Sequence, residues 1–328
     1  MFEEERAAAH WYGGRYTLSM RSMDEEQPLK SQLPFPYNKD LSSVLTHLNR
    51  RTAAGRSRLA NDPVTAAYLS AAMRLIERHL GPGAERTPLD PDDENSFTRP
   101  LLAFLSQRAV AAEVSNNPHP FPRIGSASTL RATWETTSDF VADLLSFGLL
   151  PEQYPVGFDQ EMAAGAEKLI EGPDLVKAVH DLAYLDTATV IRMPSFRLML
   201  VAAAAAEDDE VIQEAMAENY QGSIEPWKQL YLLLLQTRGL QLRPGITIDD
   251  FANLLMAVTD GLALRTIGDS TAQVIDHEQR RSLLGTAALA VIHGCLERIE
   301  DADGMTLEQA VHAKIYDRPQ TAQNSACP

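Results

Sequence analysis

From residue 137 onward the chain reads as a succession of apolar segments with helical spacing. Apolar residues recur at intervals of three and four, and Pro173, Pro194 and Gly245 stand between the periodic segments. No run of strict apolar and polar alternation, which is the pattern of a half-buried strand, interrupts them. The sequence therefore predicts an all-α fold. The helices that we expect in this part cover residues 159–170, 173–184, 194–206, 208–236, 248–266, 277–299 and 306–316.

The first 150 residues contain fewer segments with helical spacing and more prolines, glycines and polar stretches that interrupt helices. Asn61 or Asp62 can cap a helix that has Pro63 in its first turn and ends at Gly81. Further helices are expected at 101–114, at 126–134 behind a serine cap, and after Thr137 or Ser138. The division that we expect is an N-terminal extension over 1–60, partly disordered with a basic segment, then domains over 61–150 and 151–318, and a flexible tail over 319–328.

Charge is distributed unevenly along the chain. Residues 1–134 hold 16 Lys or Arg and 15 Asp or Glu, a formal charge of +1, whereas residues 135–328 hold 13 and 30, a formal charge of −17. The acidic residues 135–328 would repel phosphate, so only residues 1–134 are suited to approach nucleic acid. An acidic surface also simply aids solubility, and the charge by itself leaves both interpretations open.

Several classes of protein are disfavoured by what the sequence lacks. Cys295 and Cys327, the two cysteines, are too few for a disulfide framework or a four-thiolate zinc site. No segment reaches the roughly 20 apolar residues of a membrane span, and the acidic N-terminus does not resemble a signal peptide. Phosphate-loop, dinucleotide-binding, nucleophile-elbow and zinc-protease motifs are absent. We expect a cytoplasmic protein with no cofactor, no metal, no membrane partner and no enzymatic activity.

The segments between residues 194 and 298 follow a definite order. An apolar helix begins at Pro194, acids and a long helix follow, and a short connection runs from Gly239 to Gly245. The next segment, TIDDFANLLMAVTDGLAL, begins with a double-aspartate cap and includes Asp-Gly-Leu-Ala. This order resembles the effector-binding and dimerisation domain of TetR-family regulators. The resemblance implies a helical bundle that binds a small-molecule effector and forms a homodimer.

The last two long helices of this region carry wide apolar faces. Two such helices from each of two subunits would make a four-helix dimer interface. The same faces would also serve as the core of a monomer, and the sequence leaves that alternative open. The interface residues that we expect are Leu255, Leu284, Ala288, Val291, Ile292 and Cys295.

A second set of matching positions lies between residues 101 and 145. Residues 101–114 resemble the first helix of the TetR-family helix-turn-helix, and IGSASTLRATWETTSDFVADLL resembles the recognition helix and the helix after it. Leu130 stands at the position of the core leucine, Trp134 at that of the aromatic residue, and Phe140 at that of the last leucine. The resemblance implies a helix-turn-helix domain that binds a double-stranded DNA operator.

The residues that would face DNA depart from the family pattern. Arg131 replaces a phosphate-contacting tyrosine, Thr133 a histidine and Thr137 a lysine. Arginine can contact phosphate or guanine in bidentate fashion, and short hydroxyls suit phosphates and base edges. A basic stretch over 50–58 is either a short helix or groove-reaching arm, or a solvated linker. The DNA-binding residues that we expect are Arg108, Arg123, Ser126, Ser128, Thr129, Arg131, Thr133, Trp134 and Thr137.

Apolar and aromatic residues supply the candidate effector pocket, although each would serve equally well in a plain core. They are Phe196, Met199, Trp227, Tyr231, Phe251 and Met256. The sequence thus favours a ligand-responsive, dimeric repressor whose effector shifts an equilibrium between two spacings of the DNA-binding heads. Two alternatives stay open: a TetR-like ligand-binding dimer that does not read DNA, and an all-α enzyme without a recognisable motif.

Overall fold

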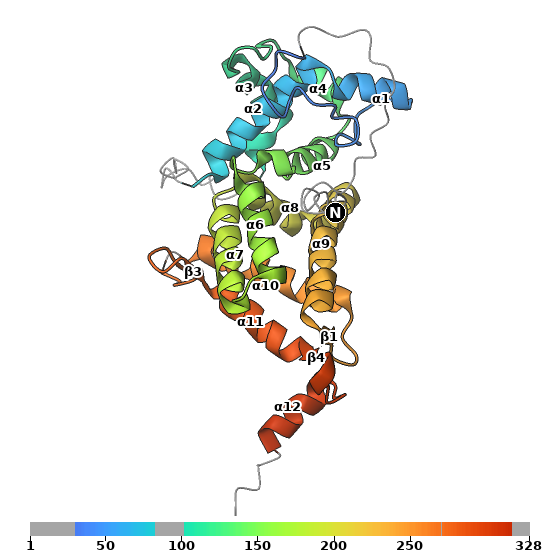
Figure 1. Ribbon diagram of the computed structural model, residues 1–328. Coiled ribbons are helices and arrows are strands. Elements are labelled where there is room, and N and C mark those ends of the chain that lie inside the picture. Colours follow the sequence, from blue (N-terminus) through green and yellow to red (C-terminus); the bar gives the residue numbers. More distant parts are fainter. Residues whose placement is uncertain (1–29, 83–101, 270, 317–328) are drawn as a thin grey trace, which may run out of the picture. The chain divides into compact units, whose positions relative to one another are not determined.

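The computed structural model describes residues 30–82, 102–269 and 271–316 (Figure 1). Within these ranges the chain forms twelve α-helices and four strands of two or three residues each. The strands make two antiparallel pairs, and neither pair extends into a larger sheet. The expected all-α class is confirmed at this level. The pairs are β1 (Leu240–Leu242) with β4 (Leu296–Arg298) and β2 (Ile275–Asp276) with β3 (Arg281–Ser282).

The chain divides into two compact units. The first unit comprises Met1–Glu161 and Ala188–Ser223, and the second comprises Met162–Thr187 and Ile224–Pro328. Residues 188–223, which the sequence analysis assigns to the C-terminal domain, therefore cluster with the N-terminal part. The reason is packing, because the apolar helix that begins at Pro194 lies against the helices that begin at Pro63 and Thr137.

The first unit is built around one long helix. Its helices are α1 (Ala53–Ala60), α2 (Pro63–Leu80), α3 (Gln107–Glu113), α4 (Ala127–Thr133), α5 (Thr137–Gly148), α8 (Pro194–Ala205) and the first part of α9 (Glu210–Arg238). Helix α2 contacts α3, α4, α5 and α8. Its start follows the sequence signals, since the side chain of Asp62 accepts a hydrogen bond from the amide of Val64 at 2.8 Å, and Pro63 occupies the first turn.

The segment before α1 is part of this packed unit. Leu33, Leu41, Leu45 and Leu48 are almost completely buried, and the last three have helical spacing although residues 41–48 form turns and irregular structure. Residues 30–60 are thus part of the packed first unit, whereas residues 1–29 lie outside the described ranges, so the expectation of a partly disordered extension over 1–60 stays a prediction. Buried leucines can thus anchor an irregular segment on a neighbouring core even where their spacing is that of a helix.

The second unit contains α10 (Ile248–Gly268), α11 (Leu283–Cys295) and α12 (Leu307–Tyr316), together with most of α6 (Phe158–Glu171) and α7 (Leu175–Val190) and the last part of α9. Helices α10 and α11 pack against each other, as Figure 1 shows. Part of the core is a cluster that these helices share with α9 and β4. Its buried members are Leu235, Phe251, Leu255, Cys295 and Leu296.

Helix α11 is shorter than the 277–299 segment that the sequence predicts. Before it, β2 and β3 form a hairpin in which Arg280 has a φ of 50°. This left-handed conformation is incompatible with a continuous α-helix through residue 280. After it, Leu296 to Arg298 extend as β4 and pair with β1. None of the helices in the described ranges combines the length and the apolar character that crossing a membrane requires.

Candidate nucleic-acid interface

The start of α4 is fixed by a buried tyrosine. The Tyr68 hydroxyl donates to the carbonyl oxygen of Ser126 and accepts from the amide of Ser126, both at 3.0 Å. The Ser126 hydroxyl in turn accepts from the amide of Thr129 at 3.1 Å and caps the helix. A Cβ on Gly125 would lie 3.1 Å from the Tyr68 ring, so glycine allows this close approach. These contacts hold the first turn of α4 in one position on α2.

Three hydroxyl groups gather at this end of α4. The Oγ of Ser126 lies 2.8 Å from that of Ser128 and 2.9 Å from the Oγ1 of Thr129, and all three residues are exposed. Hydroxyl rotors can reorient, so the cluster can donate to an external acceptor while it keeps its internal contacts. Phosphate oxygens and base edges are acceptors of this kind.

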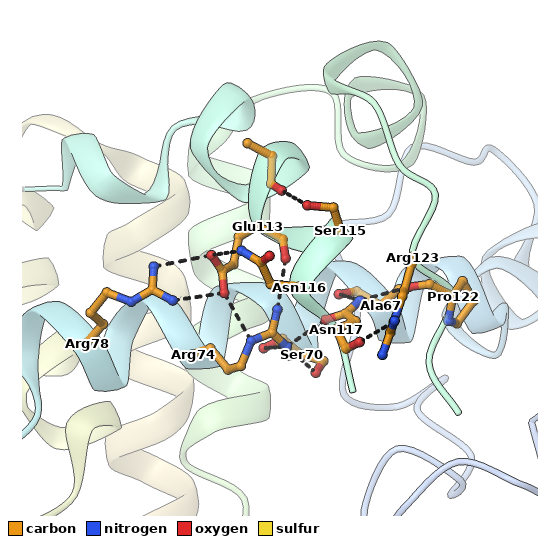
Figure 2. A network of polar contacts seen from close by, with 11 residues as sticks. Ala67, Ser70, Arg74, Arg78, Glu113, Ser115, Asn116, Asn117, Pro122 and Arg123 are labelled. Carbon is orange, nitrogen blue, oxygen red and sulfur yellow. Dashed lines mark hydrogen bonds and ion pairs between the residues drawn. The ribbon is translucent and has the colours of Figure 1, made fainter. Parts of the chain in front are cut away.

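The loop that leads into α4 is held by a network of polar side chains (Figure 2). The Asn117 side chain is completely buried, and its Nδ2 donates to the carbonyl oxygens of Ala67 and Pro122 at 3.1 and 3.0 Å. Its Oδ1 accepts from Arg74 Nη1 at 2.6 Å, and its backbone oxygen accepts from Arg123 Nε at 2.7 Å. Both hydrogens of Nδ2, the Oδ1 and the backbone oxygen of Asn117 therefore have partners, and these hydrogen bonds fix the loop against α2.

A buried carboxylate extends this network to the end of α3. Glu113 accepts from Arg74 Nε at 3.1 Å, from both terminal nitrogens of Arg78 and from Asn116 Nδ2 at 3.0 Å, as Figure 2 shows. Burial opposes its ionisation, but hydrogen bonds from Arg78, Asn116 and Arg74 outweigh burial and lower the pKa of Glu113. Helices α2 and α3 are therefore joined by charge-assisted hydrogen bonds as well as by packing.

The other end of α4 rests on a second buried carboxylate. Asp143 on α5 accepts from Trp134 Nε1 at 2.7 Å, from the amide of Thr46 at 2.9 Å, and from the amide and the Nδ1 of His47 at 3.0 Å. The hydrogen bond to Asp143 is the largest cause that raises the pKa of His47. The segment around His47 is thereby joined to α4 and α5.

This segment brings an arginine to the last turn of α4. The amide of Asn49 donates to the Thr133 oxygen at 2.8 Å, and Arg50 Nη1 donates to the Ala132 oxygen at 3.1 Å. Carbonyl groups in the last turn of a helix lack helical partners, so these contacts satisfy two of them. The basic stretch over 50–58 runs into the short helix α1 (Ala53–Ala60), and Asn49 and Arg50 join it to the last turn of α4.

Exposed guanidinium groups surround α4. Arg131 lies on α4 itself, where its Nε and Nη2 donate to Gln107 Oε1 at 3.2 and 3.1 Å. Arg108 projects from α3, and Arg123 precedes α4 in the loop. Each is exposed, as is Arg50. The arrangement can bind a polyanion, because each guanidinium has more donors than these contacts use.

The structure brings most of the expected DNA-contacting residues to exposed positions near α4. Thr137 is also exposed, at the start of α5. Thr133 and Trp134 differ, since both are buried, with the Thr133 hydroxyl bonded to the Thr129 oxygen at 3.1 Å. These two side chains support α4 from inside the unit and are not accessible to a ligand bound at its surface. No local pattern in the sequence points to Tyr68, Asn117 or Asp143, because each of them also has partners more than 40 positions away in the chain.

The residues expected to line an effector pocket fall into both units. Phe196 and Met199 are buried in α8 of the first unit. In the second unit, the rings of Trp227 and Tyr231 stack with centroids 6.0 Å apart, and Tyr231 meets Phe251 edge-on at 5.1 Å. Met256, also in the second unit, is half-buried on α10.

An unusual carboxyl group lies in the second unit. Burial, reinforced by the nearby charge of Asp260, raises the pKa of Asp186 to about 7, although part of its surface stays accessible. Burial, reinforced by Asp186, also raises the pKa of Tyr231. Within the described ranges no group of three or more His, Cys, Asp or Glu residues is arranged to hold a metal ion.

The residues expected at a dimer interface mostly face the core of the second unit. Leu255, Leu284 and Cys295 are buried, and Ala288, Val291 and Ile292 pack against the same core while partly accessible. Other residues of these helices are exposed. On α10 they are Leu254, Ala257, Gly261 and Leu264, and on α11 they are Leu283, Thr286 and Ala290.

Comparison of this chain with protein-family models, with curated proteins and with solved structures finds no match.

Proposed function

We propose that the chain is a TetR-like, DNA-binding transcriptional regulator that acts as a ligand-responsive dimeric repressor. The observation that carries the proposal is the surface of α4, where hydroxyls and guanidinium groups are exposed on a helix whose two ends are tied to buried side chains. A surface that reads DNA needs this combination, because its donors must be held in register with phosphates and base edges.

The packing of α2, α3 and α4 supports this reading. Helix α3 contacts both α2 and α4, and α4 also contacts α2. In a helix-turn-helix unit the second of two short helices enters the major groove while the others support it. Here α4 has the exposed donors, and the loop between α3 and α4 takes the place of the turn. Arg131 is the residue best placed for a bidentate contact with phosphate or guanine.

The exposed faces of α10 and α11 support a homodimer. Leu254, Ala257, Gly261 and Leu264 are spaced by three and four residues and so share one side of α10. A leucine surface interrupted by alanine and glycine lets a second helix approach closely. The partner that we propose is a second copy of the chain, joined about a twofold axis through these faces. Leu255, Leu284 and Cys295 then belong to the core behind the interface.

The second unit also contains the aromatic residues that we assign to effector binding. Trp227, Tyr231 and Phe251 form one continuous run of ring contacts. The effector would favour one of two spacings between the DNA-binding heads, and so lower affinity for successive major grooves about 34 Å apart. A regulator of this kind acts in the cytoplasm.

The test is selection of DNA from a fragmented genomic library by the purified protein at about 0.1 M salt, which damps non-specific phosphate binding. We expect enrichment of one palindromic motif. Arg131→Ala should lose the motif, and Arg192→Ala, which removes another exposed arginine of the first unit, should retain it. Retrieval of unrelated sequences, or of none, would contradict operator reading and favour a ligand-binding dimer without DNA recognition.

A further inference from the structure

An exposed isoleucine stands directly beside the hydroxyl cluster of α4. Ile124 is 88% exposed and lies two residues before Ser126, the residue that caps α4. Its neighbours are Arg123 and Gly125, so a single apolar side chain is presented among groups that suit a polyanion. In the described part of the first unit the exposed large hydrophobic residues are Phe35, Ile124, Val156 and Tyr220, and Ile124 is set apart by its place directly before the hydroxyl cluster of α4.

Contacts on both sides of Ile124 keep it at the surface. Before it, Arg123 Nε is bonded to the Asn117 oxygen. After it, Gly125 lies against the ring of Tyr68, and the backbone of Ser126 is bonded twice to the Tyr68 hydroxyl. Turning Ile124 inward would break these contacts, so the fold holds the side chain in the outward position.

We propose that Ile124 contributes to sequence recognition by packing against the C5-methyl group of a thymine in the major groove. The inference rests on the proposed function and names one base that the site reads. The thymine methyl is the one apolar group that base edges present in the major groove. A rigid, branched apolar side chain next to a helix that enters the groove is suited to meet it.

The surroundings of Ile124 favour DNA over a protein partner at this point. Within the next seven residues the exposed side chains are Ser126, Ser128, Thr129 and Arg131. Protein interfaces have apolar centres, whereas this surface has one apolar side chain among hydroxyls and guanidinium groups. Its polar groups can bind phosphates and fix the register, and Ile124 can then discriminate between thymine and other bases.

The experiment uses the operator recovered by the genomic selection. Each thymine is replaced in turn by deoxyuridine, which pairs identically and lacks only the methyl group. For the wild-type protein we expect binding to weaken about fourfold at one symmetrical position in each half-site, since one methyl group is removed from contact. Ile124→Ala should bind both operators equally, and Ile124→Val should keep part of the difference.

The controls separate the contact from other effects. Val156→Ala changes another fully exposed aliphatic residue of the first unit and should keep the wild-type preference for thymine. Thermal unfolding of Ile124→Ala should match that of the wild type, because the side chain has little to lose in the free protein. If deoxyuridine has no effect at any position, or if Ile124→Ala keeps the preference, the inference is wrong while operator reading stands. If no operator can be recovered, the proposed function fails as well.

Discussion

The two units differ in the number of large apolar side chains that they leave exposed, and the first has the more extensive buried polar network around its candidate site. The first unit buries charged and amide groups, among them Glu113, Asn117 and Asp143, and gives each of them several hydrogen-bond partners. The second unit leaves many large apolar side chains exposed. Of the exposed large hydrophobic residues in the described ranges, only Phe35, Ile124, Val156 and Tyr220 belong to the first unit.

This difference separates two kinds of task. A buried polar network fixes a unique arrangement, and that suits a surface whose donors must match a rigid ligand. Exposed apolar helix faces indicate a surface that is covered by another protein. The difference is consistent with the proposal in which the first unit reads DNA and the second joins two copies.

The largest effect is expected from Asp143→Ala. This change leaves the Trp134 indole and the amides of Thr46 and His47 without their acceptor inside the first unit. We expect the unfolding free energy to fall by about 4 kcal/mol, as when one partner of a buried charged network is removed. Urea denaturation followed by tryptophan fluorescence would measure it.

The matched control for this change is Asp208→Ala, which removes an exposed carboxylate of the same unit. Its effect should stay within about 0.5 kcal/mol. Equal effects of the two variants would show that the buried network does not stabilise the first unit.

The next effect concerns the exposed face of α10. Leu264→Glu places a charge on each side of the proposed twofold interface, so two leucine contacts are lost together. We expect dimer affinity to fall by more than about 100-fold, since each buried leucine contributes about 1.5–3 kcal/mol. Sedimentation equilibrium would measure it.

Val176→Glu changes an exposed apolar residue on α7 and should leave dimer affinity unchanged. A dimer that tolerates Leu264→Glu would remove α10 from the interface and weaken the contrast between the units.

A smaller effect is expected from Asp186→Asn. The folded pKa of Asp186 is raised to about 7, above its ordinary value of 3.8, so the ionised carboxylate destabilises the second unit above pH 7. The destabilisation diminishes as pH falls from 7 towards 3.8 and is absent below that, where the group is protonated in both the folded and unfolded states. Asp186→Asn should therefore raise the melting temperature at pH 8 and progressively less at lower pH. A gain that is independent of pH would show that the carboxyl is not strained.

Local signals in the sequence predicted the helices whose ends carry their own caps. The start of α2 at Asp62 and Pro63, the serine cap of α4 and the start of α10 at Ile248 all agree with the structure. These features depend on residues within one turn, so a sequence shows them directly. The end of α11 did not follow, because pairing of β4 with β1 involves residues more than 50 positions apart.

The candidate site was predictable only in part. Ser126, Ser128, Thr129 and Arg131 were found because a short capped helix carries them. Asn117 gave no signal, since its partners come from α2 and from the following loop. Leu255, Leu284 and Cys295, which the sequence offered either for a dimer interface or for a monomer core, are buried in the second unit. Both helices are apolar on several sides, and a sequence alone does not say which side meets the core of its own chain.

Hydroxyl-radical footprinting on the selected DNA tests the division of tasks most directly. We expect two protected half-sites related by twofold symmetry, with centres about 34 Å or a multiple of it apart. Arg131→Ala should abolish both half-sites, and Leu264→Glu should weaken both together without shifting them. Uniform protection along the fragment, or one unsymmetrical site that Leu264→Glu leaves unchanged, would contradict the account in which the first unit reads DNA and the second joins two copies.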